Sequence, residues 1–210
     1  MSQFAEQEKA LLHILEAIGT TNKFCVEFGA RDGVCDSNTL VLRKRGWECL
    51  LFDNVCHNET INLYKHSVTP QNINDLFARY DVPTELDFLS IDIDGMDYYV
   101  WEALEYQPRV VEIEANINLP PDVSLAIKPD NDFCWTPNST YAGASPLALY
   151  NLGRRKGYKL VAMPACDMLF VRNDCDYPEK TLEQLFTKPF VLPGQRAPRD
   201  KWQNFEWQEV

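Results

Sequence analysis

The sequence predicts a single α/β domain built on a mainly parallel sheet with helices on both faces. Short apolar runs typical of buried strands alternate with segments of helical periodicity through four or five units. The first apolar run also ends in a glycine-bearing turn that leads into a helix-like segment, which is half of a nucleotide-binding unit. The chain has 210 residues, enough for one such domain, over residues 1–210, with a sizeable core.

The first unit is centred on the stretch Phe24–Gly33. It begins as an apolar run and then becomes Glu27-x-Gly29-x-x-x-Gly33. Glycine suits this turn because the backbone must reverse tightly and let a ligand approach closely. The Glu27 carboxylate, at the strand end, is placed to accept hydrogen bonds from a cationic or hydroxyl-bearing ligand. A helix is expected to follow over about residues 37–45.

The second unit supplies an acid at an informative distance. A strand over residues 47–52 is followed by Asp53, which lies 20 residues after Gly33. At this offset an acidic residue after the second strand is able to bond ribose hydroxyls. The alternative role for Asp53 is an Asx turn or a helix cap.

The remaining elements follow the same alternation. Expected in chain order are an N-terminal helix over 1–19, a short strand or helix end at 61–64, a helix from 69 to before 83, a strand at 86–91, a helix at 98–104, a strand at 109–114, a helix at 145–155 opened by Ser145 and Pro146, a hairpin of 158–163 and 167–171, and a short helix near 182–186. Residues 118–141 lack periodicity and are rich in proline, aspartate and asparagine, so we expect an active-site loop over the carboxyl end of the sheet.

Composition excludes some classes of partner. The formal net charge is −11 and the pI about 4.7, which argues against a nucleic-acid partner because such proteins need a basic face. No apolar run is long enough to span a membrane, and the N-terminus lacks the pattern of a signal peptide. A C-terminal extension over 177–210 carries Trp202, Phe205 and Trp207, which either pack on a second subunit in a homo-oligomer or fold back on the core.

The cysteine pattern indicates free thiols. Seven cysteines are present, an odd number, and no pair has C-x-x-C spacing. Cys25, Cys49 and Cys166 lie in apolar strand-like runs, where a thiol packs as a small hydrophobic group. We therefore expect no disulfide framework, and a reduced, cytoplasmic protein.

Carboxylates gather at the ends of two later strands. Asp92, Asp94 and Asp97 follow the strand at 86–91, and Glu112 and Glu114 end the strand at 109–114. Parallel strands place their carboxyl ends on one edge of the sheet. Clustered acids repel one another unless something positive lies among them, and Mg²⁺ or another hard divalent cation prefers oxygen ligands. The plainer alternative is that the aspartates cap the next helix and the glutamates pair with arginines.

Three stretches together resemble the class I S-adenosylmethionine-dependent methyltransferases. Glu27–Gly33 resembles the first motif of that family, at the methionine end of the cofactor, and Asp53 resembles the acid that holds the ribose. Leu89–Gly95 resembles the fourth motif, at the end of the fourth strand. The closing hairpin resembles the family's antiparallel seventh strand. The resemblance spans roughly residues 22–172 and looks most like FkbM-type and related sugar or natural-product O-methyltransferases.

The resemblance implies a three-layer Rossmann-like methyltransferase sandwich, with a mainly parallel seven-stranded sheet and an antiparallel C-terminal hairpin. It implies S-adenosylmethionine as the cofactor, whose expected contacts are Glu27, Gly29, Ala30, Arg31, Gly33, Asp53, Asn54 and Asp92. Residues of the third strand depart from the family because no acid marks the adenine ring, which leaves Thr69, Asn72 or a backbone amide for that role.

The implied reaction is in-line methyl transfer to an oxygen of a saccharide or other small metabolite. Asp92 and Asp94 are the catalytic candidates, because a base helps when the nucleophile is a hydroxyl. Some sugar O-methyltransferases that resemble this pattern hold a divalent metal on acids of strands four and five, which implies Asp92, Asp94 and Glu114 as ligands. Such a metal binds the acceptor's hydroxyls and lowers the pKa of the attacking one.

Weaker candidates surround this site. His57 and His66 are secondary candidates for the base, and Trp135 and Tyr141 are candidates for the acceptor site. Gly143 and Ala144 leave room at a helix N-terminus for a phosphate or carboxylate of the acceptor, such as a sugar phosphate, although a tight turn is the simpler explanation.

Two other functions fit parts of the sequence. An NAD-dependent oxidoreductase would also use a strand–turn–helix unit and Asp53, but the turn is Gly-x-x-x-Gly rather than Gly-x-Gly-x-x-Gly. A non-catalytic binding protein that keeps the fold is the other alternative, because a fold does not establish an activity.

Overall fold

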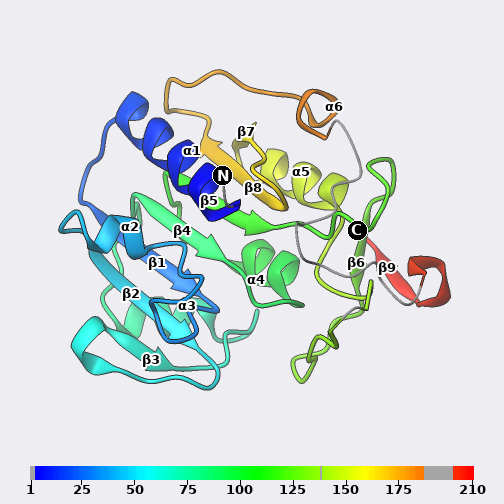
Figure 1. The fold of residues 1–210 in the computed structure, drawn as a ribbon, viewed down its shortest axis with the longest axis horizontal. Coiled ribbons are helices and arrows are strands. Elements are labelled where there is room, and N and C mark those ends of the chain that lie inside the picture. The colour runs from blue at the N-terminus through cyan, green and yellow to red at the C-terminus, as the bar shows by residue number, and fades with distance from the viewer. Residues whose placement is uncertain (1–2, 138, 187–200) are drawn as a thin grey trace.

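A seven-stranded sheet forms the centre of the protein in a computed structural model, which describes residues 3–137, 139–186 and 201–210 (Figure 1). Its strands are β1 (Phe24–Phe28), β2 (Glu48–Asp53), β3 (Leu63–Lys65), β4 (Phe88–Ile91), β5 (Val110–Glu114), β7 (Tyr158–Ala162) and β8 (Asp167–Arg172). The strand order is β3-β2-β1-β4-β5-β8-β7. Strands β1 to β5 pair in parallel, whereas β8 runs antiparallel to both of its neighbours. The expected α/β sheet with an antiparallel C-terminal hairpin is therefore confirmed.

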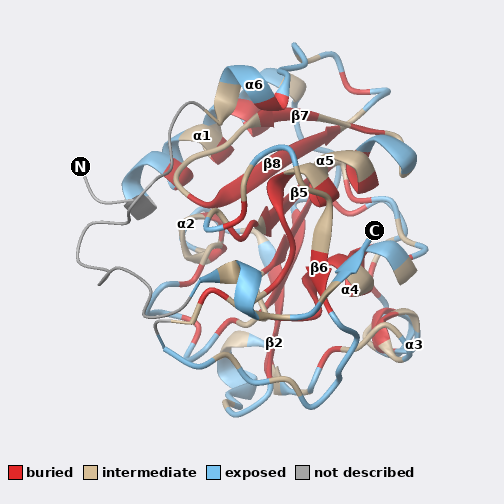
Figure 2. Cartoon of the chain, turned by 90° about the vertical axis from the view of Figure 1, so that its right-hand side faces the viewer, coloured by how far each residue is buried: buried red, intermediate tan, exposed pale blue. Residues whose placement is uncertain are grey.

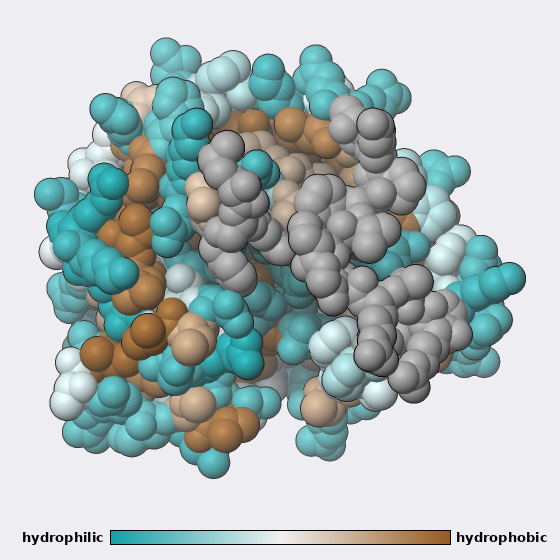
Figure 3. Space-filling view, in the orientation of Figure 1, coloured by the Kyte–Doolittle hydropathy of each residue, from teal (hydrophilic) through white to brown (hydrophobic). Residues whose placement is uncertain are grey.

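Helices cover both faces of this sheet and complete three layers. They are α1 (Gln3–Ile18), α2 (Leu40–Arg43), α3 (Ile73–Arg79), α4 (Asp97–Ala103), α5 (Pro146–Arg155) and α6 (Leu182–Leu185), with 3-10 turns η1 (Glu59–Ile61) and η2 (Trp202–Asn204). Side chains alternate along a strand, so β1 sends Cys25 to the core under α1 and α2, and Val26 and Phe28 to the core under α3, α4 and α5. Figure 2 shows the strands as a buried layer among more exposed helices. The face drawn in Figure 3 is mostly hydrophilic, as the composition leads one to expect.

Two elements are shorter than the sequence predicts, for local reasons. The helix expected over 37–45 is the four-residue α2, because residues 37–39 form a loop whose polar groups hydrogen-bond to Glu27. The helix expected from Thr69 begins at Ile73. The Asn72 side chain accepts a hydrogen bond from the Thr69 amide and donates one to the Ser67 carbonyl, which holds a turn in front of the helix.

A second, two-stranded sheet lies outside the main one. Strand β6 (Leu125–Ile127) lies in the segment expected to be loop, and it pairs antiparallel with β9 (Trp207–Glu209) at the C-terminus. The Tyr141 ring packs on Phe205 and Trp207, at centroid distances of 5.0 and 4.8 Å. The aromatic tail therefore folds back on its own chain, while residues 187–200 of the expected C-terminal extension lie outside the described residues.

The prediction of free thiols is wrong for one pair of cysteines. Cys25 of β1 and Cys49 of β2 form a disulfide with their Cα atoms 4.6 Å apart. The parallel register places these two residues directly opposite each other, on the same face of the sheet. Structural disulfides are typical of oxidising compartments and rare in the cytosol. The disulfide therefore does not support the expected cytoplasmic location, which stays a prediction. None of the helices in the described part of the chain is both long and apolar enough to cross a membrane.

A buried carboxylate anchors the start of the sheet. Asp87, just before β4, accepts hydrogen bonds from the backbone amides of Thr21, Asn22 and Lys23 at 2.7–2.9 Å. It also pairs with Arg109 at 3.0 Å, and its side chain is completely buried. Asp87 thus ties the α1–β1 connection to the entrances of β4 and β5.

Candidate functional site

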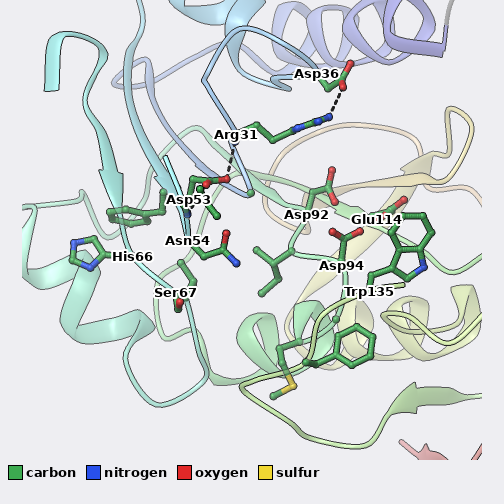
Figure 4. A pocket seen from close by; sticks show the side chains of 18 of the residues that line it. Arg31, Asp36, Asp53, Asn54, His66, Ser67, Asp92, Asp94, Glu114 and Trp135 are labelled. Carbon is green, nitrogen blue, oxygen red and sulfur yellow. Dashed lines mark hydrogen bonds and ion pairs between the residues drawn. The ribbon is translucent and has the colours of Figure 1, made fainter. Parts of the chain in front are cut away.

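A cavity of about 740 Å³ lies at the carboxyl ends of β1, β2, β4 and β5 (Figure 4). Gly29 lines it after β1, Asp53 and Asn54 line it at the end of β2, and Asp92 and Glu114 line it from β4 and β5. Strands β2 and β4 flank β1 on opposite sides, so the cavity lies at a switch point of the sheet, where ligands of open α/β folds bind. Its volume is within the usual range for small-molecule sites.

Gly29 lets the end of β1 touch the end of β4. Its φ is +74°, and a Cβ at this position would lie 1.7 Å from the backbone oxygen of Asp92. Its amide donates to the carbonyl of Phe52 at 3.0 Å. The glycine of the first motif is therefore needed for strand-to-strand contact as well as for a tight turn.

Replacing Gly29 with alanine is expected to lower the free energy of unfolding much more than Gly46→Ala. Gly46 is the matched control because its φ is +80° and nothing lies within 4 Å of its added Cβ. The control isolates the cost of the left-handed backbone, about 1–2 kcal/mol. The clash with Asp92 should add about 2–3 kcal/mol. Urea unfolding checks this, and equal losses in the two variants would show that the contact with β4 is unimportant.

Glu27 does not belong to the residues that line the cavity, so its contact with a cofactor stays a prediction. Its carboxylate is buried and accepts hydrogen bonds from the Ser37 hydroxyl at 2.8 Å, the Asn38 amide at 2.7 Å, and both the amide and hydroxyl of Thr39. Burial raises the pKa of Glu27, against the lowering effect of these hydrogen bonds. Glu27 therefore acts on the cavity through the loop that it holds. Ala30 and Gly33 also lie outside the residues that line it.

Asp53 is held at the cavity by backbone amides. One carboxylate oxygen accepts from the amides of Val55 and Cys56 at 2.8 Å, and the other accepts from the Arg31 amide at 2.9 Å. The Asx turn considered as its alternative role is thus present. Since a carboxylate offers about four acceptor positions, Asp53 keeps capacity for a ligand hydroxyl. The Arg31 side chain extends away from Asp53 to pair with Asp36 at 2.7 Å (Figure 4).

Three carboxylates meet at the opposite end of the cavity. Oxygen atoms of Asp92, Asp94 and Glu114 all lie within 4.8 Å of one another, and Figure 4 shows the three side chains grouped together. Burial, followed by the charge of Glu114, raises the pKa of Asp92 well above its usual range. Burial and then Asp167 raise the pKa of Glu114 to about 8. Without a positive partner these acids therefore tend to keep their protons, and a bound cation would displace the protons and stabilise the carboxylates.

The donor set suits a hard divalent cation. Oxygens on opposite sides of Mg²⁺ lie about 4.2 Å apart, and on opposite sides of Ca²⁺ about 4.6–5.2 Å apart. The observed limit of 4.8 Å therefore admits an ion of the calcium size directly, and one of the magnesium size after a small closure of the side chains. Asp94 is exposed, which leaves a side of the site open to water or substrate.

The other acids at these strand ends have structural roles. Asp97 is buried and accepts a hydrogen bond from the Ile93 amide at 2.8 Å at the start of α4, and burial raises its pKa to about 6. Glu112 is buried and hydrogen-bonds to the Gln7 side chain of α1. The capping alternative is not confirmed, because the N-cap residue of α4 is Met96 and makes no side-chain cap hydrogen bond, while the Asp97 carboxylate bonds to the turn before the helix.

Of the weaker candidates for the base and the acceptor site, some line the cavity and others do not. His66 lines the cavity but hydrogen-bonds to Tyr80 at 2.8 Å, on the side away from the carboxylate cluster (Figure 4). His57 lies outside the cavity lining and is within 3.4 Å of Glu59. Trp135 lines the cavity as expected.

Tyr141 does not line the cavity itself but packs on the ring of Phe133, which does, at a centroid distance of 5.8 Å, and its role in the acceptor site stays a prediction. Its hydroxyl accepts from the Lys128 amide and donates to the Glu206 carbonyl. At the start of α5, where an anion site is also considered, two polar groups already have partners. The Gly143 amide donates to Asp94, and the Ser145 hydroxyl caps the helix by accepting from the Ala148 amide.

Sequence reasoning missed the contribution of α1. Gln7 lines the cavity and donates to the Asn38 side chain at 3.0 Å, and Asn38 in turn donates to the Ser90 hydroxyl at 2.9 Å. The available signal was a glutamine four residues before Leu11, on the apolar stripe of an amphipathic helix. Ser67 and Val68 after β3 and Asp130 and Asn131 of the long loop were also missed as lining residues.

Comparisons with known proteins give distant matches in structure only. No protein-family model and no curated protein matches the chain. Similar solved structures include the MycE methyltransferase of the mycinamycin biosynthetic pathway in complex with Mg and SAH (10% identity, TM-score 0.42, 87% of this chain and 53% of that one). A second is the CMeT domain of the citrinin polyketide synthase (8% identity, TM-score 0.41, 82% of this chain and 52% of that one). A third is a SAM-dependent methyltransferase from Aquifex aeolicus (11% identity, TM-score 0.36, 78% of this chain and 87% of that one). The chain spans about half the length of the first two, and at these identities the likeness concerns the fold alone.

Proposed function

We propose that the protein is an S-adenosylmethionine-dependent methyltransferase that acts on an oxygen of a saccharide or another small metabolite. The observation that carries this proposal is the joining of two sites in one cavity. Asp53 lies at the end of β2, where the acid of a nucleoside site is expected, and the carboxylate cluster lies at the ends of β4 and β5. A donor with a ribose and a positive sulfonium matches this pairing of groups.

The lining residues fit the parts of this cofactor. Asp53 would hold the ribose hydroxyls, and the adenine would lie against Val68 and Ile93, where the Ser67 hydroxyl and backbone amides supply polar contacts. The asparagine considered for this role, Asn72, is occupied by its own turn. The methionine end would lie toward Gly29 and Asp92, which brings the sulfonium close to the acidic cluster.

The acceptor hydroxyl would approach the methyl group beside Asp94. The main task of the protein is to hold donor and acceptor in line and to exclude water. Asp94 is the candidate for receiving the hydroxyl proton. Although the residue as a whole is exposed, partial burial of its carboxyl group raises the pKa, in the direction that makes a carboxylate a better base. Asp92, Asp94 and Glu114 would hold a divalent cation, which supplies Lewis-acid activation of the acceptor hydroxyl when bound.

Calorimetric titration tests the cofactor assignment. S-adenosylhomocysteine is expected to bind with one site per chain, and NAD is expected not to bind. Asp53→Ala should weaken binding at least about tenfold, because a charged hydrogen-bond acceptor for the ribose is lost. Tight NAD binding would favour the oxidoreductase, and binding without transfer to any of a broad acceptor panel would favour a non-catalytic protein.

The matched control for this variant is Asp32→Ala. Asp32 accepts hydrogen bonds from the amides of Val34 and Cys35 at 2.8 and 2.7 Å, as Asp53 does from Val55 and Cys56, but it does not line the cavity. Asp32→Ala should therefore leave the affinity within about twofold. Equal weakening in both variants would trace the effect to the turns and contradict the ribose assignment.

A further inference from the structure

We propose that the methyl acceptor is uncharged or carries an amine, and that the cavity rejects acceptors that carry a phosphate or a carboxylate. This inference rests on the proposed function and names its substrate class. It departs from the sugar phosphate that the sequence leaves open.

Negative side chains dominate the cavity wall. Besides Asp36, which pairs with Arg31, the cavity is lined by the carboxylates of six acidic residues: Asp53, Asp92, Asp94, Glu114, Asp130 and Asp167. Among the described lining residues, the basic side chains are Arg31 and His66. Arg31 is paired with Asp36 at 2.7 Å and its side chain is 65% exposed. Burial lowers the pKa of His66, which favours the neutral imidazole.

The cavity stays negative after both cofactors are counted. S-adenosylmethionine brings a net charge of +1 and a divalent cation brings +2, and the five carboxylates of Asp53, Asp92, Asp94, Glu114 and Asp130 already exceed this sum. A cleft lined by one sign of charge concentrates ions of the opposite sign and repels its own. An anionic group on the acceptor would therefore meet net repulsion, and the Arg31 guanidinium is already paired with Asp36.

The acceptor end also offers an aromatic surface. Trp135 lies beside Glu114 and Asp94 in Figure 4, and its indole NH donates to the Ser139 carbonyl at 3.2 Å. Phe133 packs against the turn after β4, where a Cβ on Gly95 would lie 2.4 Å from its ring. An aromatic face next to carboxylates suits the apolar face of a sugar ring or an ammonium group.

The start of α5, which the sequence offered as an anion site, has several of its donors in use. At the N-terminus of α5 the Ser145 amide donates to the Leu125 carbonyl, and the Ser145 hydroxyl donates to the Val123 carbonyl at 2.6 Å. The Gly143 amide is used by Asp94. These donors are therefore not available to a phosphate.

Ion-selective quenching of Trp135 fluorescence tests the proposal. The difference between wild-type protein and Trp135→Phe isolates the emission of this tryptophan, which is a partly exposed loop residue. Caesium and iodide are compared at equal ionic strength, with acrylamide as the neutral reference. The caesium-to-iodide ratio of quenching constants is expected to be at least about fivefold higher than for free N-acetyltryptophanamide. A ratio equal to or below that of the free compound would overturn the proposal.

A matched pair of variants locates the effect. Asp130→Asn should lower the caesium-to-iodide ratio, because Asp130 lines the cavity, whereas Asp132→Asn should leave it unchanged, because Asp132 is exposed outside it. Equal changes in both would assign the selectivity to general surface charge and overturn the proposal. Calorimetry with S-adenosylhomocysteine on the same samples tests the methyltransferase assignment separately from the acceptor class. Absence of binding there refutes the methyltransferase assignment, whereas binding combined with iodide preference refutes the acceptor class alone.

Discussion

Replacing Asp94 with asparagine is expected to weaken Mn²⁺ binding by at least about 100-fold, because a carboxylate ligand is worth more than the outer contacts whose loss costs 10–100-fold. Asp94 adopts φ +63°, a backbone region that asparagine tolerates nearly as well as aspartate. The variant therefore changes the ligand charge without adding the backbone strain that alanine would bring. Loss of the free Mn²⁺ signal in electron paramagnetic resonance measures the bound ion.

The control for the metal site is Asp130→Asn. Asp130 lines the same cavity from the long loop but does not belong to the group formed with Asp92 and Glu114. The affinity of the Asp130→Asn variant for Mn²⁺ should stay within about threefold of that of the wild type. If wild-type protein binds no Mn²⁺ at millimolar concentrations, or if both variants weaken binding equally, the three carboxylates do not form a metal site.

Asp87→Ala is expected to cost about 3–5 kcal/mol in the free energy of unfolding at pH 7, because it leaves Arg109 and three backbone amides without their buried acceptor. The pairing distances of 2.7–3.0 Å and complete burial place this carboxylate among the strongest single anchors of the fold. Asp122→Ala is the surface control, since Asp122 is exposed, and it should change stability by less than about 0.5 kcal/mol. Urea unfolding measures both.

The difference in the free energy of unfolding between wild type and Asp87→Ala depends on pH through the pKa of Asp87. Burial alone would raise that pKa, but the amides of Thr21 and Lys23 and the Arg109 guanidinium outweigh it, and the pKa is lowered. The stability contributed by Asp87 is fully present above its unfolded pKa of about 3.9 and is lost as the pH falls through the folded value. The gap between wild type and Asp87→Ala should therefore narrow below pH 4. A gap that stays constant from pH 7 to pH 3 would contradict the claim that the ionised Asp87 carboxylate stabilises the fold.

The parts of the site that the sequence predicts are those governed by strand order. Asp53, Asp92, Asp94 and Glu114 each stand at or just after the end of an apolar run, and parallel pairing brings such ends to one edge whatever the details of packing. The Ser145–Pro146 start of α5 was predictable for a local reason, because capping depends on adjacent residues alone. Local patterns and topology together therefore locate the cavity.

The parts that the sequence does not predict depend on contacts between distant residues. The Cys25–Cys49 disulfide requires the register of β1 on β2, and the pairing of β6 with β9 joins residues about eighty positions apart. Glu27 lies at the expected strand end, yet its side chain turns toward residues 37–39 because that loop offers four donors. Strand alternation predicts the face of a side chain but not its hydrogen-bond partner.

The central claim is that one cavity at the carboxyl edge of the sheet holds both the methyl donor and the carboxylates that activate the acceptor. A crystal structure of the protein soaked with S-adenosylhomocysteine and MnCl₂ tests it most directly. We expect the ribose hydroxyls within hydrogen-bond distance of Asp53, the sulfur toward Asp92, and anomalous density for Mn²⁺ among Asp92, Asp94 and Glu114. S-adenosylhomocysteine bound elsewhere, or this cavity empty at ligand concentrations that saturate the protein in solution, would contradict the claim.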